Sequence, residues 1–340
     1  MPRKPRIEFE GAVYHVMCRG DHGEDVYRDE HDRHGFLECL AQVCMKTCWR
    51  VHAYVLLSNH YHLLVETPRA NLVVGMHWLQ GTYTGRYNRR HRLRGHLFQG
   101  RYKPLLIEPE QDDYFLQVAT YIHLNPVRAG LAGPRKVALK EYPWSSYPAY
   151  LATERRRPAW LCVERVLAAL ALADTAAERS AYAAHMAERV RQALRRGDGD
   201  LARQWEAIRR GWCLGGEDFR TRMQRRLDKL LHGHLPDSYA GPAVEEHQQR
   251  TAEELLAAGL KAVGLSPDDL PDLPKTDPRK QAVAWWIRKH TTARNRWVSE
   301  RLHMGHEVNV CQAVRRIEHA TRGKLAGWKK AVVKTLKSKD

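Results

Sequence analysis

No apolar run in the chain approaches the roughly 20 residues that a membrane-spanning helix requires. The first six residues lead directly into polar sequence and therefore do not resemble a secretory signal. These two absences argue against a membrane partner and against export. We therefore expect a cytoplasmic protein.

The cysteines do not form a metal-binding or disulfide pattern. The chain has seven cysteines, an odd number, and it lacks the paired C-x-x-C motifs of common zinc sites. Reduced, mostly buried thiols are the usual state of cysteine in a cytosolic protein. We therefore expect neither a disulfide framework nor a zinc site.

Acidic residues are too few to balance the basic ones. The 340 residues include 39 Asp and Glu against 56 Lys and Arg, a formal net charge of +17. A positive excess of this size attracts polyanions and makes binding sensitive to salt. Nucleic acid is therefore the expected partner, and the length allows two or three domains.

Two histidines one residue apart stand in an apolar, strand-like stretch, residues 59–66. Alternate side chains of a strand point to the same face, so His60 and His62 share one face and Tyr61 lies on the other. Two neutral imidazoles directed at one point form half of a divalent-metal site. The His-x-His pattern also occurs by chance, and an exposed strand face is the alternative when no third ligand or nucleophile accompanies it.

A second stretch, residues 113–125, has helical periodicity and is expected to end before Pro126, because the residue that precedes a proline disfavours helical geometry. Tyr121 and Asn125 are four residues apart and therefore project from one face of this helix. The amide oxygen of Asn125 can serve as a third metal ligand, and Tyr121 can place a hydroxyl beside a phosphate held there. Metal on a basic protein of this kind points to phosphodiester chemistry.

These two elements resemble those of a known enzyme family. His60-Tyr61-His62 is similar to the His-hydrophobic-His element of the HUH single-strand nucleases and transposases, and residues 121–131 resemble their catalytic tyrosine helix. The similarity is closest to the REP-associated tyrosine transposases, bacterial relatives of the IS200-like transposases. Three further stretches, residues 11–16, 95–103 and 142–147, fit the same group, so the resemblance covers residues 2 to about 150.

The resemblance implies a transposase that cuts and rejoins DNA through a 5′-phosphotyrosine intermediate. It implies Tyr121 as the nucleophile and His60, His62 and Asn125 as ligands of the metal ion. Two nitrogens and one oxygen suit Mn²⁺ and tolerate Mg²⁺, so one of these ions is the expected cofactor. The implied partners are single-stranded and hairpin DNA, with palindromic repeats as the substrate class, and the oligomeric state is left open.

The order of the expected elements predicts the fold of residues 1–150. A strand, a helix, a hairpin, a helix and a strand form the ferredoxin-like pattern, an antiparallel sheet with packed helices. We therefore expect an α+β HUH catalytic domain, followed by a mostly α-helical C-terminal region. The patterns place strands at residues 12–18, 51–57, 60–66 and 102–107 and helices at residues 29–48, 72–89 and 112–125.

An arginine-rich segment, residues 86–101, lies between the histidine strand and the tyrosine helix. Runs of charge are usually solvated faces, but the density of guanidinium groups and the interleaved Tyr87 and Phe98 favour a surface that binds DNA phosphates and stacks bases. A basic arm at residues 2–6 is a further candidate, with a disordered tail as its alternative. The expected DNA contacts are Arg86, Arg89, Arg90, Arg92, Arg94, Phe98, Arg101 and Lys103.

Residues 151–275 are rich in alanine, arginine and leucine with helical spacing, for example at 163–173 and 177–194. We expect a helical connecting region without chemistry of its own, in which residues 212–219 interrupt the pattern. A proline- and aspartate-rich break at residues 265–274 predicts a boundary or a turn before the last domain.

Residues 276–340 contain helical stretches at 278–289, 296–302 and 307–319, with the short connector 304–306 before the last. This arrangement is similar to a helix-turn-helix and resembles the DNA-binding end of the replication initiator DnaA. A plain helical bundle with a solvated basic face is the main alternative. The residues expected to face the groove or the phosphates are Asn309, Gln312, Arg315 and Arg316. The basic tail that supports a duplex-binding module comprises Arg322, Lys324, Lys329, Lys330, Lys334 and Lys337.

The sequence as a whole predicts a metal-dependent DNA strand transferase with Tyr121 as its nucleophile. One alternative is a non-catalytic, sequence-specific DNA-binding protein, although such a protein has no need of two histidines, a tyrosine and an asparagine in this pattern. The other is a metal-dependent phosphodiesterase in which water attacks and Tyr121 only packs. A DNA substrate also predicts association with the nucleoid.

Overall fold

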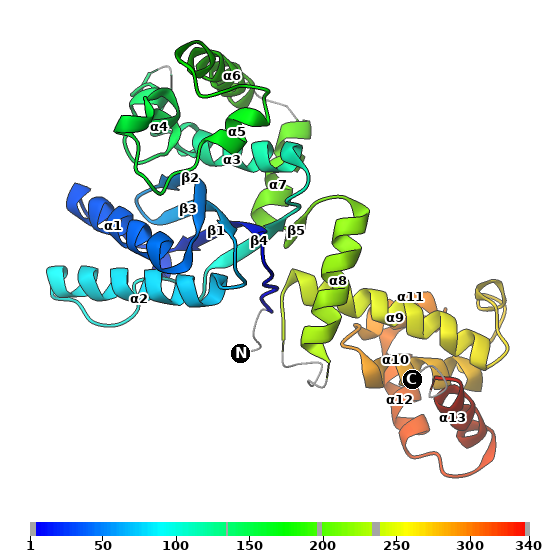
Figure 1. Ribbon diagram of the computed structural model, residues 1–340. Helices are drawn as coiled ribbons and strands as arrows, with labels where there is room; N and C mark the ends of the chain where they lie inside the picture. Colours follow the sequence, from blue (N-terminus) through cyan, green and yellow to red (C-terminus); the bar gives the residue numbers. More distant parts are fainter. Residues whose placement is uncertain (1–4, 134, 196–198, 233–238, 337–340) are drawn as a thin grey trace. The chain divides into compact units, whose positions relative to one another are not determined.

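The computed structural model describes residues 5–133, 135–195, 199–232 and 239–336 (Figure 1). Within these ranges, no helix is both long and apolar enough to cross a membrane. The chain forms two compact units, one of which is Arg6–Met223, whereas the other comprises mainly Gln224–Asp340. Residues 2–4 of the expected basic arm, and Lys337 of the expected basic tail, lie outside the described residues.

The first unit is built on a mixed sheet with the strand order β2-β3-β1-β4-β5 in the described residues. β1 lies in the centre and pairs antiparallel with β3 and β4, so Met17 stands opposite both His62 and Lys103. Side chains directly opposite each other share a face of the sheet, which gathers these three residues on one side. The strands are β1 (Ala12–Arg19), β2 (Arg50–Leu56), β3 (His60–Thr67), β4 (Lys103–Ile107) and β5 (Cys213–Leu214).

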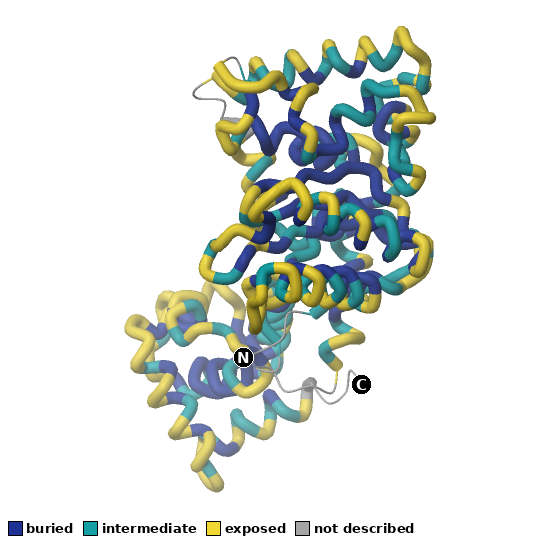
Figure 2. The backbone as a smooth tube through the Cα atoms, turned by 90° about the vertical axis from the view of Figure 1, so that its left-hand side faces the viewer, coloured by how far each residue is buried: buried dark blue, intermediate teal, exposed yellow. Residues whose placement is uncertain are grey.

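Helices cover the two faces of this sheet (Figure 1). Phe36 of α1 (Glu30–Thr47) lies 4.8 Å from the ring of Tyr61, and Gln80 of α2 (Leu72–His91) donates a hydrogen bond to the Tyr61 hydroxyl. α1 and α2 therefore cover the Tyr61 face. α3 (Asp112–Arg128) covers the opposite face, on which the histidines lie. The buried residues lie in the interior between these layers, and the exposed residues lie on their outer sides (Figure 2).

The expected fold class is confirmed, with one difference in the sheet. The strands and helices of the ferredoxin-like pattern occur in the expected order. The sheet is mixed rather than antiparallel, because β5 runs parallel to β4. The Leu106 amide donates to the Trp212 carbonyl and the Glu108 amide donates to the Leu214 carbonyl, so β5 satisfies backbone groups that an open edge would leave unpaired. Two residues are too few for a strand pattern to be visible in the sequence.

The prediction that the tyrosine helix ends before Pro126 is wrong. α3 continues to Arg128, and the Ala129 amide donates to the Asn125 carbonyl at 2.8 Å. A proline inside a helix removes one backbone hydrogen bond, but burial of residues 118–127 holds this last turn in place. As a consequence, Arg128 lies seven residues, or two helical turns, after Tyr121 and shares its face with Asn125.

The remainder of the first unit is largely helical. Only part of the stretch expected at residues 163–173 is helical, whereas the helix expected at 177–194 is confirmed. The helices are α4 (Tyr147–Leu151), α5 (Glu164–Ala168), α6 (Ala176–Leu194) and α7 (Gly199–Arg210), with short 3₁₀ turns at Asp21–Gly23, Leu139–Glu141 and Glu154–Arg156. The next helix, α8 (Glu217–Leu231), begins in this unit and ends in the second.

The second unit is a bundle of helices around a core that includes Trp285. Lys280 is fully buried there, and its ammonium group donates to the backbone carbonyls of Leu270 and Leu273 at 2.7 and 2.9 Å. These bonds attach the proline-rich segment, which contains the 3₁₀ turn Pro267–Asp269, to the bundle. The three helices expected after residue 276 are present, to within two residues at each end. The helices are α9 (Pro242–Ala262), α10 (Pro278–His290), α11 (Asn295–Arg301), α12 (Glu307–Glu318) and α13 (Gly323–Leu336).

Candidate active site

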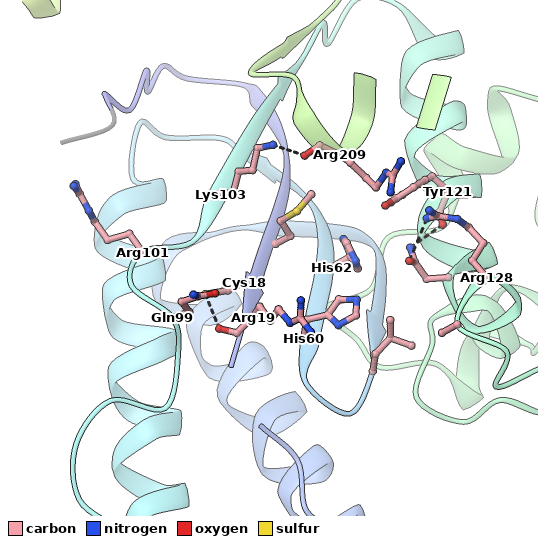
Figure 3. Close-up of a pocket in the computed structure, with 14 residues that line it drawn as sticks. Cys18, Arg19, His60, His62, Gln99, Arg101, Lys103, Tyr121, Arg128 and Arg209 are labelled. Atoms are coloured by element: carbon pink, nitrogen blue, oxygen red, sulfur yellow. Dashed lines mark hydrogen bonds between the residues drawn. The ribbon is translucent and has the colours of Figure 1, made fainter. Parts of the chain in front are cut away.

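A pocket of about 520 Å³ opens between the histidine face of the sheet and α3 (Figure 3). β3 supplies His60 and His62, and α3 supplies Tyr121 and Asn125, so the four residues singled out by the sequence line one cavity. The complete lining is Met17, Cys18, Arg19, Leu57, His60, His62, Gln99, Arg101, Lys103, Tyr121, Asn125, Arg128, Ala129 and Arg209.

The two histidines of β3 are neutral at physiological pH. Burial, together with the positive charges of Arg19 and Arg128, lowers the pKa of His60 to about 4. Burial, reinforced by the neighbouring His15 and His60, holds the pKa of His62 well below its ordinary value. Their ring centroids are 5.2 Å apart. Neutral imidazole is the form that binds metal ions, so burial prepares both rings for this role.

One nitrogen of each ring is already engaged. His60 Nδ1 lies 2.7 Å from Asn59 Oδ1, and His62 Nδ1 lies 2.8 Å from His15 Nε2. Neither Nε2 atom has a protein partner among the described residues. A metal-binding histidine typically has its second nitrogen held by a hydrogen bond in this way, which leaves two Nε2 atoms available for a ligand.

Tyr121 lies across from the histidines and is only 2 % exposed. Its ring makes edge contacts with His62 and His15, with centroid separations of 5.7 Å in both cases. The guanidinium carbon of Arg128 lies 4.6 Å from the centroid of the Tyr121 ring. The phenol is therefore fixed between the imidazoles of the sheet and a cation of its own helix (Figure 3).

Asn125 is buried beside Tyr121 with a defined amide orientation. Its Nδ2 donates to the Tyr121 carbonyl at 2.9 Å, and Arg128 Nη1 approaches its Oδ1 at 3.5 Å. Because the nitrogen is used within the helix, the oxygen is the atom left for a ligand. This is the amide oxygen that the sequence pointed to as a third metal donor.

The donor set fits a divalent ion that takes further oxygens from its substrate. The described residues contain no group of three or more His, Cys, Asp and Glu side chains placed to hold a metal. His60, His62 and Asn125 offer two nitrogens and one oxygen, all neutral, on one pocket wall. A neutral, incomplete set is compatible with Mg²⁺ or Mn²⁺ when phosphate and water supply the other ligands.

Positive side chains surround this donor set. Arg101 and Lys103, both expected as DNA contacts, line the pocket, whereas Arg19, Arg128 and Arg209 were not singled out by the sequence. Among the described residues that line it, none is acidic. Arg209 comes from α7, a part of the chain to which the sequence assigned no chemistry and in which no motif marked it. The pocket is thus suited to a phosphate group.

α7 also contributes an aromatic ring close to the pocket. The ring of Trp205 lies 4.5 Å from the guanidinium carbon of Arg128 and 6.4 Å, between centroids, from Tyr121. Arg128 therefore contacts two aromatic rings, those of Tyr121 and Trp205. Sequence reasoning missed this residue, because Trp205 is more than 80 positions away from Tyr121 and belongs to no recognisable motif.

The arginine-rich segment contains both exposed and ion-paired residues. Arg89, Arg92 and Arg94 are exposed. Arg90 forms ion pairs of 2.6 Å with both Asp29 and Asp32, which offset its charge. Arg86 likewise lies near Glu38, at 3.7 Å.

The interpretation of Phe98 and Tyr87 as base-stacking residues is corrected. Phe98 is 6 % exposed and its ring contacts Tyr61 edge-on, with a centroid separation of 5.8 Å. Tyr87 is 3 % exposed and its hydroxyl donates to the Asp25 carbonyl. Both rings belong to the core between α2 and the sheet, so neither presents a face to a base.

The terminal unit presents most of its predicted DNA contacts to solvent. Gln312, Arg315 and Arg316 are exposed on α12. Asn309 donates through its side chain to the Met304 carbonyl, which fixes the connector before α12. A DNA-reading role for these residues, and for the helix pair α11 and α12, stays a prediction.

Comparisons with known proteins gave one family match and similar solved structures. Residues 8–125, about a third of the chain, match the family model described as "Transposase IS200 like". A solved structure of a REP-associated tyrosine transposase bound to a REP hairpin is also similar, with 16% identity and a TM-score of 0.38, over 48% of this chain and 92% of that one. Curated proteins show no match.

The family match supports a DNA transposase, and it contains four of the residues described above. His60, His62, Tyr121 and Asn125 lie within residues 8–125. Arg128 and the α7 side chains lie beyond its end. Part of the pocket wall is therefore built by chain outside the matched segment.

Proposed function

From the transposase match, we propose that the chain is a metal-dependent DNA strand transferase that cuts and rejoins single-stranded or hairpin DNA through Tyr121. The observation that carries this proposal is the convergence of Tyr121, His60, His62 and Asn125 in one pocket lined by cations. A protein that only binds DNA has no use for a buried phenol beside two neutral imidazoles. The boundaries of a catalytic, a connecting and a terminal domain at residues 150 and 275 are part of the proposal.

The cationic lining would bind the phosphate to be cut. Lys103 and Arg128 approach the pocket from the sheet and from α3, and Arg209 approaches from α7 (Figure 3). Fixed positive groups stabilise the charge that develops on phosphate oxygens during displacement, because they need no reorganisation when the reaction occurs. A bound Mg²⁺ or Mn²⁺ would add Lewis-acid polarisation of the same phosphate.

Tyr121 would then exchange one phosphodiester for another. Its oxygen forms a bond to phosphorus, the bond from phosphorus to the 3′ oxygen breaks, and the 3′ oxygen gains a proton as the phenol loses one. The products are a 5′-phosphotyrosine and a free 3′-hydroxyl. Bonds of the same type are formed and broken, so the step is close to balanced, needs no ATP and can run in reverse to rejoin the strand. Covalent attachment keeps hold of the cut end, which strand transfer requires.

The proposed substrate is DNA that can present unpaired bases next to a stem. The resemblance of residues 11–16, 95–103 and 142–147 to REP-associated transposases makes hairpins from palindromic repeats the class to test first. The exposed Arg89, Arg92 and Arg94 and the terminal helices would supply further contacts to phosphate.

A covalent adduct tests the proposal. Purified protein is incubated with Mn²⁺ or Mg²⁺ and a hairpin labelled on the side that would stay with the enzyme, and the mixture is denatured before electrophoresis. We expect label to migrate with the wild-type protein and not with Tyr121→Phe. Tyr114→Phe is the matched control, because Tyr114 is on the same helix but outside the pocket. Cut DNA without any adduct would instead indicate attack by water.

A further inference from the structure

His15 is a fully buried histidine of β1 that the proposed reaction does not use. It lies on the same face of the sheet as His62, two residue pairs along the ladder, and its Nε2 is 2.8 Å from His62 Nδ1. The two rings are nearly parallel, with centroids 5.0 Å apart and an interplanar angle of 20°. His15 therefore stands directly behind one of the proposed metal ligands.

The other nitrogen of His15, Nδ1, makes no hydrogen bond that would stabilise the fold, as far as the described residues show. His15 Nδ1 is buried and has no hydrogen-bond partner in the described part of the chain. His52 and His123, which are also buried, use both nitrogens: His123 bonds Tyr182 and Ser146, and His52 bonds the Cys162 carbonyl and Glu66. Buried polar atoms are normally paired, because an unpaired one destabilises the fold. A histidine kept only for structure would be expected to look like His123.

The two proposed ligand histidines are oriented by different kinds of partner. The Asn59 amide donates through Nδ2 to the Gly23 carbonyl at 2.9 Å, which fixes its oxygen as the group that faces His60 Nδ1. An amide oxygen can only accept, so His60 carries its proton on Nδ1 and keeps the Nε2 lone pair for a ligand. The partner of His62 is another imidazole, which can either donate or accept.

From this arrangement we propose that His15 is a positioning residue that accepts a hydrogen bond from His62 Nδ1 and thereby directs the Nε2 lone pair of His62 into the pocket. This inference rests on the proposed function, in which His62 is a metal ligand. In this direction of the bond, His15 must carry its own proton on Nδ1, which faces no acceptor. The residue thus favours metal binding at the expense of fold stability, as is common for groups in functional sites.

The proposal predicts opposite effects of one substitution on stability and on metal affinity. His15→Phe removes the unpaired nitrogen and fills the site with an apolar ring, so the thermal unfolding temperature should rise. Its dissociation constant for Mn²⁺ should increase about 10- to 100-fold, the usual effect of removing the partner of a metal-binding histidine. His15→Gln returns a carbonyl oxygen to this position and should restore much of the affinity.

The experiment measures free Mn²⁺ by electron paramagnetic resonance during titration of the full chain, together with thermal unfolding. His52→Phe is the matched control: it should lower the unfolding temperature, because it removes the hydrogen bonds of His52 to Glu66 and to the Cys162 carbonyl, and leave Mn²⁺ binding unchanged. Unchanged Mn²⁺ affinity in His15→Phe would overturn the positioning role. Two other results would contradict the metal site of the proposed function instead: no Mn²⁺ binding by the wild-type protein, or equal Mn²⁺ affinities of the wild-type protein and His62→Ala.

The tautomer of His62 provides a second readout that does not depend on a variant. Nitrogen-15 NMR of labelled histidines in the wild-type protein with Mg²⁺ should show the proton of His62 on Nδ1. A proton on Nε2 would overturn the proposal, and this measurement decides the question if His15→Phe does not fold.

Discussion

The guanidinium carbon of Arg128 lies 4.6 Å from the ring centroid of Tyr121, and the ring of Trp205 lies 4.5 Å from the same carbon on another side. Contacts between a guanidinium and an aromatic ring are favourable, by about 0.5 to 2 kcal/mol depending on solvent exposure. Trp205 therefore holds a cation next to the proposed nucleophile. Trp205 of α7 thus contacts a side chain, Arg128, that lies beside the proposed nucleophile of α3.

We expect Arg128 and Trp205 to affect the rate of adduct formation differently. Arg128→Gln removes a charge from the phosphate pocket and should slow single-turnover adduct formation about 100-fold, the order seen when one transition-state donor is removed. Trp205→Leu leaves the charge but frees the side chain and should slow the reaction about 3- to 30-fold, because the aromatic ring no longer holds the guanidinium. Arg128→Lys should fall between wild type and Arg128→Gln, because lysine keeps the charge without the planar group. Equal rates in all four proteins would remove Arg128 from the mechanism.

Loss of either histidine should separate cleavage from binding. His60→Ala and His62→Ala remove a proposed metal ligand each, so cleavage of hairpin DNA should fall below detection. DNA affinity should stay within a few-fold of wild type, because most of it comes from lysine and arginine contacts to phosphate. Gel shifts and cleavage assays on the same preparations measure both. Variants that are folded but no longer bind DNA would show that the histidines contact the nucleic acid itself.

The salt dependence of binding tests the terminal unit. If Arg315 and Arg316 of α12 contact phosphates, replacing both with alanine should reduce the slope of log affinity against log salt by about 1 to 2, because each phosphate that the protein neutralises adds close to one to the slope. Arg296→Ala is a suitable control, since Arg296 is exposed but paired with Glu300 at 2.9 Å. A slope that does not change in the double variant would leave α12 without a role in DNA binding.

Acid should destabilise the first unit through its buried histidines. Burial lowers the pKa of His123 from 6.5 to about 3, so between these pH values the unfolded chain binds a proton that the folded chain does not. The contribution of this histidine to the free energy of unfolding is therefore fully present above pH 6.5. It falls as the pH decreases towards 3, by about 1.4 kcal/mol per pH unit for each such histidine. His123→Gln should flatten this dependence by about one proton, as measured by urea unfolding at several pH values. An unchanged slope would mean that His123 is charged in the folded protein.

The fold of the matched segment could be predicted because its signals are local. Alternation in residues 60–66 and helical spacing up to Asn125 are set by neighbours in sequence, and both survive in the structure. Strand parity placed His60 and His62 on one face, and a spacing of four residues placed Tyr121 and Asn125 on one face. The resemblance to the HUH transposases then implied that the two pairs form one site.

The sequence did not predict features that depend on packing between residues far apart in the chain. The extension of α3 through Pro126 places Arg128 in the pocket, yet it contradicts the local preference before proline. Trp205 and Arg209 enter the site only because β5 and α7 return to the edge of β4, and a two-residue strand leaves no periodic pattern. Phe98 was misassigned for the same reason: an aromatic among arginines gives no indication of whether the fold buries it.

The most direct test is to identify the atom that holds the cut DNA. Wild-type protein is allowed to react with a metal ion and hairpin DNA, the product is digested with protease and nuclease, and the peptides are analysed by mass spectrometry. We predict a nucleotide attached through its 5′ phosphate to Tyr121 and a free 3′-hydroxyl on the released strand. Cleaved DNA that carries both new ends free, with an unmodified Tyr121 peptide, would contradict a tyrosine nucleophile.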